Sequence, residues 1–254
     1  MTKQRRRHLL SDITLPEVLH VEGRALRLVR VLKWDFFAKT AEYRDETGGA
    51  CLKVQKPATV LGIPFRGLGH MMTRHEAEML EVLGGIAGIP RLMGRLGRFG
   101  VVHEWIEGVD LKHADGWPAA FFDRLAAMLA AVHARGVALV DLNKRENIIV
   151  GTDGEPGFVD FQLAYPHPGG TEGPWDPRRA WLHLLQREDW YHFYKHKSRL
   201  APEQMTDAEW PRARRSGWIA LHRRVSRPLR EFRRAILRAA DPTFKPGQER
   251  SRYL

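Results

Sequence analysis

The chain has 254 residues, 43% of them hydrophobic and 28% charged, a composition that allows a sizeable buried core and excludes a disordered chain. A single cysteine, Cys51, excludes a disulfide framework and a zinc site made of cysteines, and no apolar run approaches the ~18 residues that cross a membrane. Lysine and arginine number 41 against 30 acidic residues, a formal charge of +11, which favours an anionic partner such as a nucleotide, nucleic acid, anionic lipid or phosphosugar.

The N-terminal part of the chain carries the signals of a sheet with one helix. Residues 1–22 form a basic segment whose apolar run is too short for a secretory signal, so we expect a cytoplasmic protein. Residues 25–31 (ALRLVRV) and 50–54 (ACLKV) are short, apolar and bounded by turn signals, which predicts strands. Residues 74–83 have apolar side chains three and four apart, as in an amphipathic helix, and residues 91–106 predict a hairpin.

The middle of the chain predicts a loop, a helix and a second hairpin, in that order. Residues 107–111 (EGVDL) are expected to form a loop, and residues 121–136 a helix that a glycine ends. Two short apolar runs, 147–150 (NIIV) and 157–161 (GFVDF), flank a turn sequence and predict the hairpin. From about residue 176 the pattern is helical to the end.

The order of these elements predicts an α+β fold with two lobes. We expect a sheet-rich N-lobe at 23–104, a helical C-lobe at 105–240, a cleft between them and a polar tail at 241–254. Residues 212–238 hold ten arginines and one glutamate around an apolar stripe at helical spacing. We expect a helix that packs on the second lobe, with an anionic membrane surface as the alternative partner and RNA ranked below it.

Polar residues suited to phosphoryl chemistry gather in residues 138–165. Asp141 lies in a loop after a predicted helix, and Asn147 and Asp160 lie on the two strands of the predicted hairpin. The hairpin brings Asn147 and Asp160 to the same end, where amide and carboxylate oxygens can bind a hard cation. Ordinary acidic turns would explain the same residues, so the surrounding motifs must decide.

The stretch VDLNKRENIIV…GFVDFQ resembles the catalytic and metal-binding loops of the protein-kinase-like superfamily. ACLKV resembles the third-strand motif of that superfamily, which implies that Lys53 binds nucleotide phosphates. RHEAEML resembles the helix that carries the glutamate partner of this lysine, either Glu76 or Glu78, and the position in the motif favours Glu76. VVHEWIEGVDL resembles the segment that joins the lobes, which implies that the backbone of Glu104 to Ile106 meets the adenine of ATP.

The resemblance also implies roles for the polar residues of the second lobe. Asn147 and Asp160 would hold Mg2+, and Asp141 would orient the acceptor hydroxyl and accept its proton. If Asn143 is one extra residue, Lys144 takes the place of a lysine that steadies the transferring phosphate. The size of the chain and the short segment after Asp160 favour small bacterial kinase-like proteins near the lipopolysaccharide (Kdo-type) sugar kinases and the RIO-type kinases.

The sequence departs from the superfamily pattern at three motifs. Leu139 and Val140 replace the histidine and arginine of the HRD motif, and Gln162 replaces the glycine of DFG. The glycine-rich loop is missing, because no glycine lies between Gly23 and Gly48. The backbone of residues 36–38, with Lys33 or Lys39 adding charge, would have to cover the phosphates instead.

These patterns predict a kinase that transfers phosphate from ATP to a hydroxyl of a protein serine or threonine, or of a lipopolysaccharide-core sugar. The activation segment would be reduced, and the protein would be cytoplasmic or peripheral to the inner membrane. The alternative is a pseudokinase that acts as a nucleotide-binding or scaffold module, which the missing glycine loop and the altered HRD motif favour. A nucleic-acid-binding module rests on charge alone and ranks last.

Overall fold

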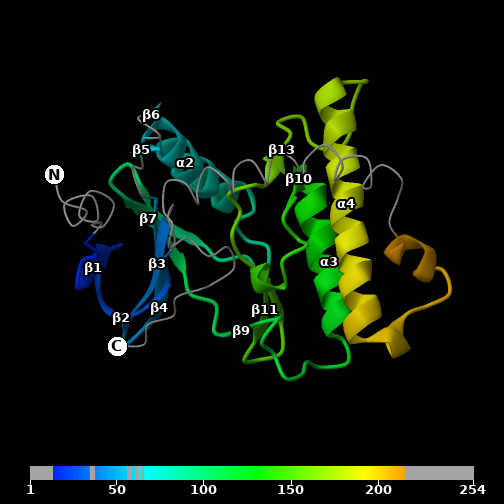
Figure 1. Ribbon diagram of the computed structural model, residues 1–254, viewed down its shortest axis with the longest axis horizontal. Helices are drawn as coiled ribbons and strands as arrows, with labels where there is room; N and C mark the ends of the chain where they lie inside the picture. The colour runs from blue at the N-terminus through cyan, green and yellow to red at the C-terminus, as the bar shows by residue number, and fades with distance from the viewer. Residues whose placement is uncertain (1–13, 35–37, 56–58, 61–62, 65, 215–254) are drawn as a thin grey trace. The chain divides into compact units, whose positions relative to one another are not determined.

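The computed structural model describes residues 14–34, 38–55, 59–60, 63–64 and 66–214 (Figure 1). The chain divides into two compact units, each described here by itself. Within the described residues, unit 1 comprises 14–81 and 91–105, and unit 2 comprises 82–90 and 106–214. The expectations for the basic start and for the arginine-rich segment beyond residue 214 lie outside the described residues.

Unit 1 contains a six-stranded antiparallel sheet, which confirms the strands predicted from the N-terminal sequence. The turn between its third and fourth strands is organised by Asp45, whose Oδ1 accepts hydrogen bonds from the backbone N–H groups of Thr47 and Gly48. Arg24 binds the same carboxylate with two nitrogens, at 2.7 and 2.8 Å. The sheet order is β1 (Val18–Val21), β2 (Arg24–Trp34), β3 (Ala38–Asp45), β4 (Gly48–Gln55), β8 (Gly100–Glu104) and β7 (Leu92–Leu96).

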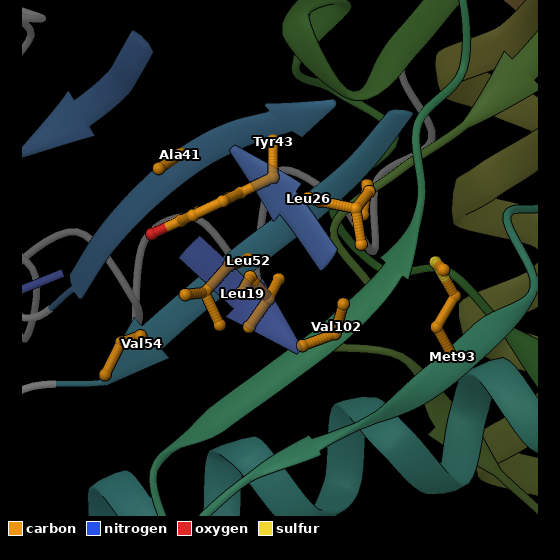
Figure 2. Close-up of a cluster of buried hydrophobic side chains, with 9 residues drawn as sticks. Leu19, Leu26, Ala41, Tyr43, Leu52, Val54, Met93 and Val102 are labelled. Carbon is orange, nitrogen blue, oxygen red and sulfur yellow. The ribbon is translucent and has the colours of Figure 1, made fainter. Parts of the chain in front are cut away.

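One face of this sheet carries the hydrophobic core of unit 1 (Figure 2). The alternation of side chains along β3 and β4 places Ala41, Tyr43, Ala50, Leu52 and Val54 on that face. Tyr43 is fully buried, and its hydroxyl donates to the carbonyl of Pro16 at 2.8 Å. The core comprises Leu19, Leu26, Ala41, Tyr43, Ala50, Leu52, Val54, Met93 and Val102.

The helix of unit 1, α2 (Arg66–Val82), begins eight residues before the amphipathic pattern that predicted it. Its early turns include Thr73, whose hydroxyl donates to the carbonyls of Gly69 and Phe99 at 3.0 and 3.1 Å. The bond to Phe99 ties the helix to the turn between β7 and β8. A two-residue pair, β5 (Thr59–Val60) and β6 (Ile63–Pro64), precedes the helix.

Unit 2 is built around two long helices, α3 (Phe121–Ala134) and α4 (Pro177–Leu200), which lie side by side in Figure 1. Their aromatic side chains meet edge to face, with the rings of Phe122 and Phe193 6.2 Å apart. Asp176 caps α4, because its carboxylate accepts the backbone N–H of Arg178 at 2.9 Å. The predicted helix at 121–136 is therefore confirmed, and Gly136 follows it with a φ of 70°.

The second predicted hairpin is also confirmed, but the loop expected at 107–111 is wrong. Residues 108–110 form β9 (Gly108–Asp110), which pairs with β11 (Ile148–Gly151), and β11 in turn pairs with β12 (Pro156–Phe158). Glycine fits at Gly108 because its backbone approaches Val150 so closely that a Cβ would clash there. A glycine beside a glutamate resembles a turn in the sequence, which hid this short strand.

The remaining elements of unit 2 are short. A second strand pair joins β10 (Val137–Ala138) to β13 (Tyr165–Pro166). The pattern predicted as helical from residue 176 holds through α4, and 3-10 helices η2 (Pro202–Gln204) and η3 (Trp210–Ala213) follow. Among the described residues, no helix is both long and apolar enough to cross a membrane.

Candidate active site

In unit 1, Lys53 of β4 and Glu76 of α2 form an ion pair with 2.9 Å between Nζ and Oε1. The side chains are 11% and 2% exposed, so both charges are largely removed from water and depend on each other. Glu78 faces another side of the helix, where it binds Arg74 in an exposed pair. The structure thus separates the two glutamates that the sequence left open, and pairs Lys53 with Glu76.

The segment expected to meet adenine begins at the end of β8. The backbone N–H of Glu104 donates to the carbonyl of Arg91 at 2.9 Å, and its carboxylate binds the Arg91 guanidinium at 2.8 Å. In unit 2, the Ile106 side chain packs directly over Gly157, where a Cβ would lie 2.9 Å from its methyl group. Base binding by Glu104 and Ile106 stays a prediction.

Of the backbone expected to cover the phosphates, residues 36–38, the first two lie outside the described residues, as does the Lys33 side chain, and Ala38 begins β3. Lys39 is described, and its register partner on β4 is Val54. Side chains alternate along a strand, so Lys39 lies on the face opposite Lys53. The expectation that Lys33 or Lys39 adds charge at the phosphates stays a prediction.

In unit 2, the three polar residues singled out in the sequence line one pocket. Asp141, Asn147 and Asp160 surround it together with Leu139, Leu142, Phe158 and Val159. The hairpin produces this convergence, because the backbone N–H of Val159 donates to the carbonyl of Asn147 at 3.0 Å where β11 and β12 meet. Asn147 itself closes the 3-10 helix η1 (Arg145–Asn147).

Asp141 is held by two neighbours within its own loop. Lys144 Nζ lies 2.5 Å from Asp141 Oδ2, and the Asn147 amide nitrogen donates to the Asp141 carbonyl at 3.3 Å. Burial raises the pKa of Asp141, the positive charge of Lys144 opposes this shift, and the negative charge of Asp160 adds to it. A carboxylate with a raised pKa next to a cation has the character of a general base.

Asn147 and Asp160 have the donor atoms that a magnesium ion requires. Because the Asn147 nitrogen donates to Asp141, its amide oxygen is the atom that can face a cation. Asp160 supplies a carboxylate on the same pocket. Mg2+ is commonly bound by one or two such oxygens together with water and substrate phosphates, so these residues fit the ion.

The backbone on both sides of the pocket is strained. Val140 and Asp160 each have a φ of 67°, in the left-handed region that side chains with a Cβ rarely adopt. For a β-branched residue such as Val140 this costs ~1–2 kcal/mol. Strain of this kind persists only where surrounding contacts over-determine the backbone.

Those contacts come from α4, and sequence reasoning missed them. Asp189 is fully buried, and its two carboxylate oxygens accept the backbone N–H groups of Leu139 and Val140 at 2.7 and 2.9 Å. Its Oδ2 also lies 3.1 Å from His133 Nε2. The carboxylate of Asp189 therefore holds the loop that leads into Asp141.

Two further residues of α4 hold the other side of the same loop. His196 Nε2 donates to the carbonyl of Leu142 at 2.9 Å, and Lys195 Nζ binds the side-chain oxygen of Asn143 at 2.6 Å. Asn143, interpreted from the sequence as an extra residue of the loop, is thus bonded to α4. Asp189 and His196, seven positions apart on α4, are both buried, but nothing in the sequence alone indicated this.

The buried His196 predicts a pH dependence of stability. Burial lowers the pKa of His196 from 6.5 to about 4, and nearby cations, Lys195 and Arg145 among them, act in the same direction. Between these two values the unfolded chain binds a proton that the folded chain does not, so stability falls as pH drops from about 6.5 and levels off below about 4. We expect a loss of ~2 kcal/mol between pH 7 and pH 5 from this group.

Urea unfolding of wild type and His196→Gln at both pH values measures this contribution. The glutamine amide can donate to the Leu142 carbonyl without titrating, so the pH-dependent loss should shrink by that amount in the variant. Because other groups titrate equally in both proteins, the difference between their losses of unfolding free energy from pH 7 to pH 5 isolates His196. Equal losses in the two proteins would contradict the role of His196 in the pH dependence.

Comparison with known proteins gives matches in structure only. No family model matches the sequence, and no curated protein sequence matches it. A solved structure of the Rio2 kinase from Chaetomium thermophilum matches with a TM-score of 0.49 and 15% identity, over 72% of this chain and 57% of that one. A second, described as a Rio2 kinase–ADP/Mg2+–phosphoaspartate complex from Chaetomium thermophilum, matches with a TM-score of 0.51 and 14% identity, over 75% and 58%.

The chain therefore spans a little under three fifths of the length of these kinases. At this identity the likeness bears on the fold alone, and the resemblance to the lipopolysaccharide sugar kinases stays a prediction. The antiparallel sheet of unit 1, the helical unit 2 and the structural match agree with the fold predicted from the order of the motifs. This chain has a two-lobed protein-kinase-like fold.

Proposed function

We propose that this protein is an ATP-dependent phosphotransferase that transfers the γ-phosphoryl group to a hydroxyl acceptor. The observation that carries the proposal is the convergence of Asp141, Asn147 and Asp160 on one pocket of unit 2. Unit 1 supports it with the largely buried pair of Lys53 and Glu76, which presents one cation at a fixed position. Such a set meets the needs of phosphoryl transfer, which are positioning and charge stabilisation.

In the proposed reaction, Asp141 orients the acceptor hydroxyl and takes its proton as the new oxygen–phosphorus bond forms. The bond between the γ-phosphorus and the bridging oxygen breaks, and ADP leaves. Lys144, which lies against Asp141, neutralises charge on the moving phosphoryl group, and Lys53 holds the nucleotide phosphates. Asn147 and Asp160 would hold Mg2+, which supplies charge neutralisation of the phosphates when bound.

We propose a hydroxyl of a protein serine or threonine, or of a sugar on a membrane glycolipid core, as the acceptor. The formal charge of +11 supports an anionic acceptor or an anionic surface near it. The arginine-rich residues 212–238 would supply contact with such a surface, and most of them lie outside the described residues.

The second candidate function is a pseudokinase that binds nucleotide without transferring phosphate. It is favoured by the absence of glycine between Gly23 and Gly48 and by Leu139 and Val140 at the HRD position. Phosphate transfer from radiolabelled ATP separates the two candidates, because a pseudokinase would bind the nucleotide and release it unchanged.

The first test of the proposal is thermal unfolding with and without Mg-ATP, in wild type and Asp160→Ala. A ligand at a hundred times its dissociation constant should stabilise the folded protein by ~2.7 kcal/mol. We expect this magnesium-dependent stabilisation in wild type and its loss in Asp160→Ala, because the carboxylate that holds the ion is gone. Asp115→Ala removes an exposed aspartate of the same unit and should retain the stabilisation. Equal stabilisation in Asp160→Ala and wild type would remove Asp160 from the metal site.

A further inference from the structure

The sheet face that carries Lys53 continues with charged residues toward the end of β8. On β4, Gly49, Cys51 and Lys53 share this face because side chains alternate along a strand. The register partner of Cys51 on β3 is Glu42, so Glu42 lies on the same face as Lys53. A nucleotide with its phosphates at Lys53 and its base at Glu104 must lie along this face.

The base end of this face is occupied by a cluster of charged and aromatic side chains, Arg30, Glu42, Arg44 and Trp105. Glu42, 3% exposed, binds Arg30 Nε at 2.6 Å and Arg44 Nε at 2.5 Å. The Trp105 side chain lies against Gly49, where a Cβ would be 2.7 Å from the Trp105 Cβ. The Arg30 guanidinium carbon lies 5.9 Å from the centre of the Trp105 ring, which is within cation–π range.

The backbone groups at this end already have partners inside unit 1. The backbone N–H of Glu104 donates to the carbonyl of Arg91, and the backbone N–H of Trp105 donates to the carbonyl of Gly49 at 3.0 Å. The Glu104 carbonyl accepts from His103 Nδ1 at 2.8 Å. The two backbone N–H donors at this end are therefore already engaged, whereas the Glu104 carbonyl keeps a second lone pair.

We propose that this end of unit 1 recognises guanine, so that the nucleotide site binds GTP at least as tightly as ATP. This inference rests on the proposed function, because it assumes that Lys53 holds the phosphates. Arg30 is the recognising residue: its Nε is held by Glu42, its guanidinium carbon lies within cation–π range of Trp105, and the side chain remains 43% exposed.

The chemistry of the two purines decides the direction of the preference. Guanine presents two neighbouring acceptors, O6 and N7, which match the paired N–H groups of a guanidinium. Adenine keeps N7 but presents an amino donor in place of O6, so it can accept one of the two N–H groups of Arg30 and turns a donor toward the other. The Trp105 ring can stack on either base, so it adds affinity without selectivity.

Titration calorimetry of the full chain with Mg-GTP, Mg-ATP and magnesium tripolyphosphate tests the inference. For wild type we expect a GTP dissociation constant equal to or below that of ATP. Arg30→Leu should weaken GTP by ~10-fold, weaken ATP by less, and leave tripolyphosphate within twofold, because only guanine bonds to both N–H groups of the lost fork. Arg30→Lys keeps the charge beside Glu42 but loses the planar fork, and should show the same loss for GTP. Arg27→Leu removes an exposed cation of the same strand and should change none of the three.

The outcomes separate this inference from the function on which it rests. ATP binding threefold or more tighter than GTP would overturn guanine recognition and leave the phosphotransferase proposal standing. An equal loss for all three ligands in Arg30→Leu would show that Arg30 acts through charge alone and would also overturn it. Failure of all three ligands to bind wild type would overturn the proposed function and this inference together.

Discussion

Replacing Asp189 by alanine is expected to lower the free energy of unfolding by ~3–5 kcal/mol. The change removes a fully buried carboxylate that accepts the backbone N–H groups of Leu139 and Val140 and contacts His133. Each buried donor left without an acceptor costs ~1–3 kcal/mol, and removal of one partner from a buried charged group costs ~3–5 kcal/mol. Val140 would also lose the contact that holds its left-handed backbone.

Urea unfolding of wild type, Asp189→Ala and Asp189→Asn measures the effect. Asparagine retains one carbonyl acceptor for the loop, so its loss of stability should be intermediate. Glu188→Ala, at the neighbouring and partly exposed position of α4, should cost less than ~1 kcal/mol. A loss of that small size in Asp189→Ala would contradict the account of a loop held by one buried carboxylate.

Local sequence patterns predicted the elements whose signals are local. The runs at 25–31, 50–54 and 91–106 form strands, and 121–136 forms a helix ended by a glycine, because alternation, helical spacing and turn residues act over a few neighbours. The hairpin around TDGEPG placed Asn147 and Asp160 at one end for the same reason. The fold followed from the order of these elements.

Contacts between distant residues were beyond this reasoning. Asp189 lies 50 positions from Leu139, and a single aspartate in a long helix carries no sign of the loop that it binds. The strand β9 was missed because its partner β11 lies far along the chain and its three residues include a glycine. The face of the sheet on which Lys39 lies depends on the β3–β4 register. The residues around Lys39 in the sequence do not reveal that register.

The candidate site divides along the same line. Residue types, together with the resemblance to the kinase-like loops, pointed to Asp141, Asn147 and Asp160, which line one pocket. The charges around the base end depend on strand register and on the packing of Trp105 against Gly49, which no motif describes. Burial also separates chemically similar residues, because Glu76 is buried with Lys53 while Glu78 is exposed beside Arg74.

Replacing Asp141 by asparagine is expected to lower turnover by ~10²–10⁴-fold while ATP affinity stays nearly unchanged. The amide keeps the shape of the side chain and can still meet the acceptor hydroxyl, but it cannot take the proton. The metal-binding oxygens assigned to Asn147 and Asp160 remain in place, so nucleotide binding should survive. The raised pKa of Asp141, caused first by its burial, is a further reason to assign the proton to this carboxylate.

Single-turnover transfer from radiolabelled ATP, with nucleotide affinity measured in parallel, separates the chemical step from binding. Asp115→Asn makes the same chemical change at an exposed position of unit 2 and should leave both quantities unchanged. Loss of ATP affinity together with turnover would show that Asp141 acts in binding or in maintaining the loop, since Lys144 and Asn147 both contact it. Turnover within threefold of wild type would remove Asp141 from the proton transfer, and the hydroxyl proton would then need another acceptor.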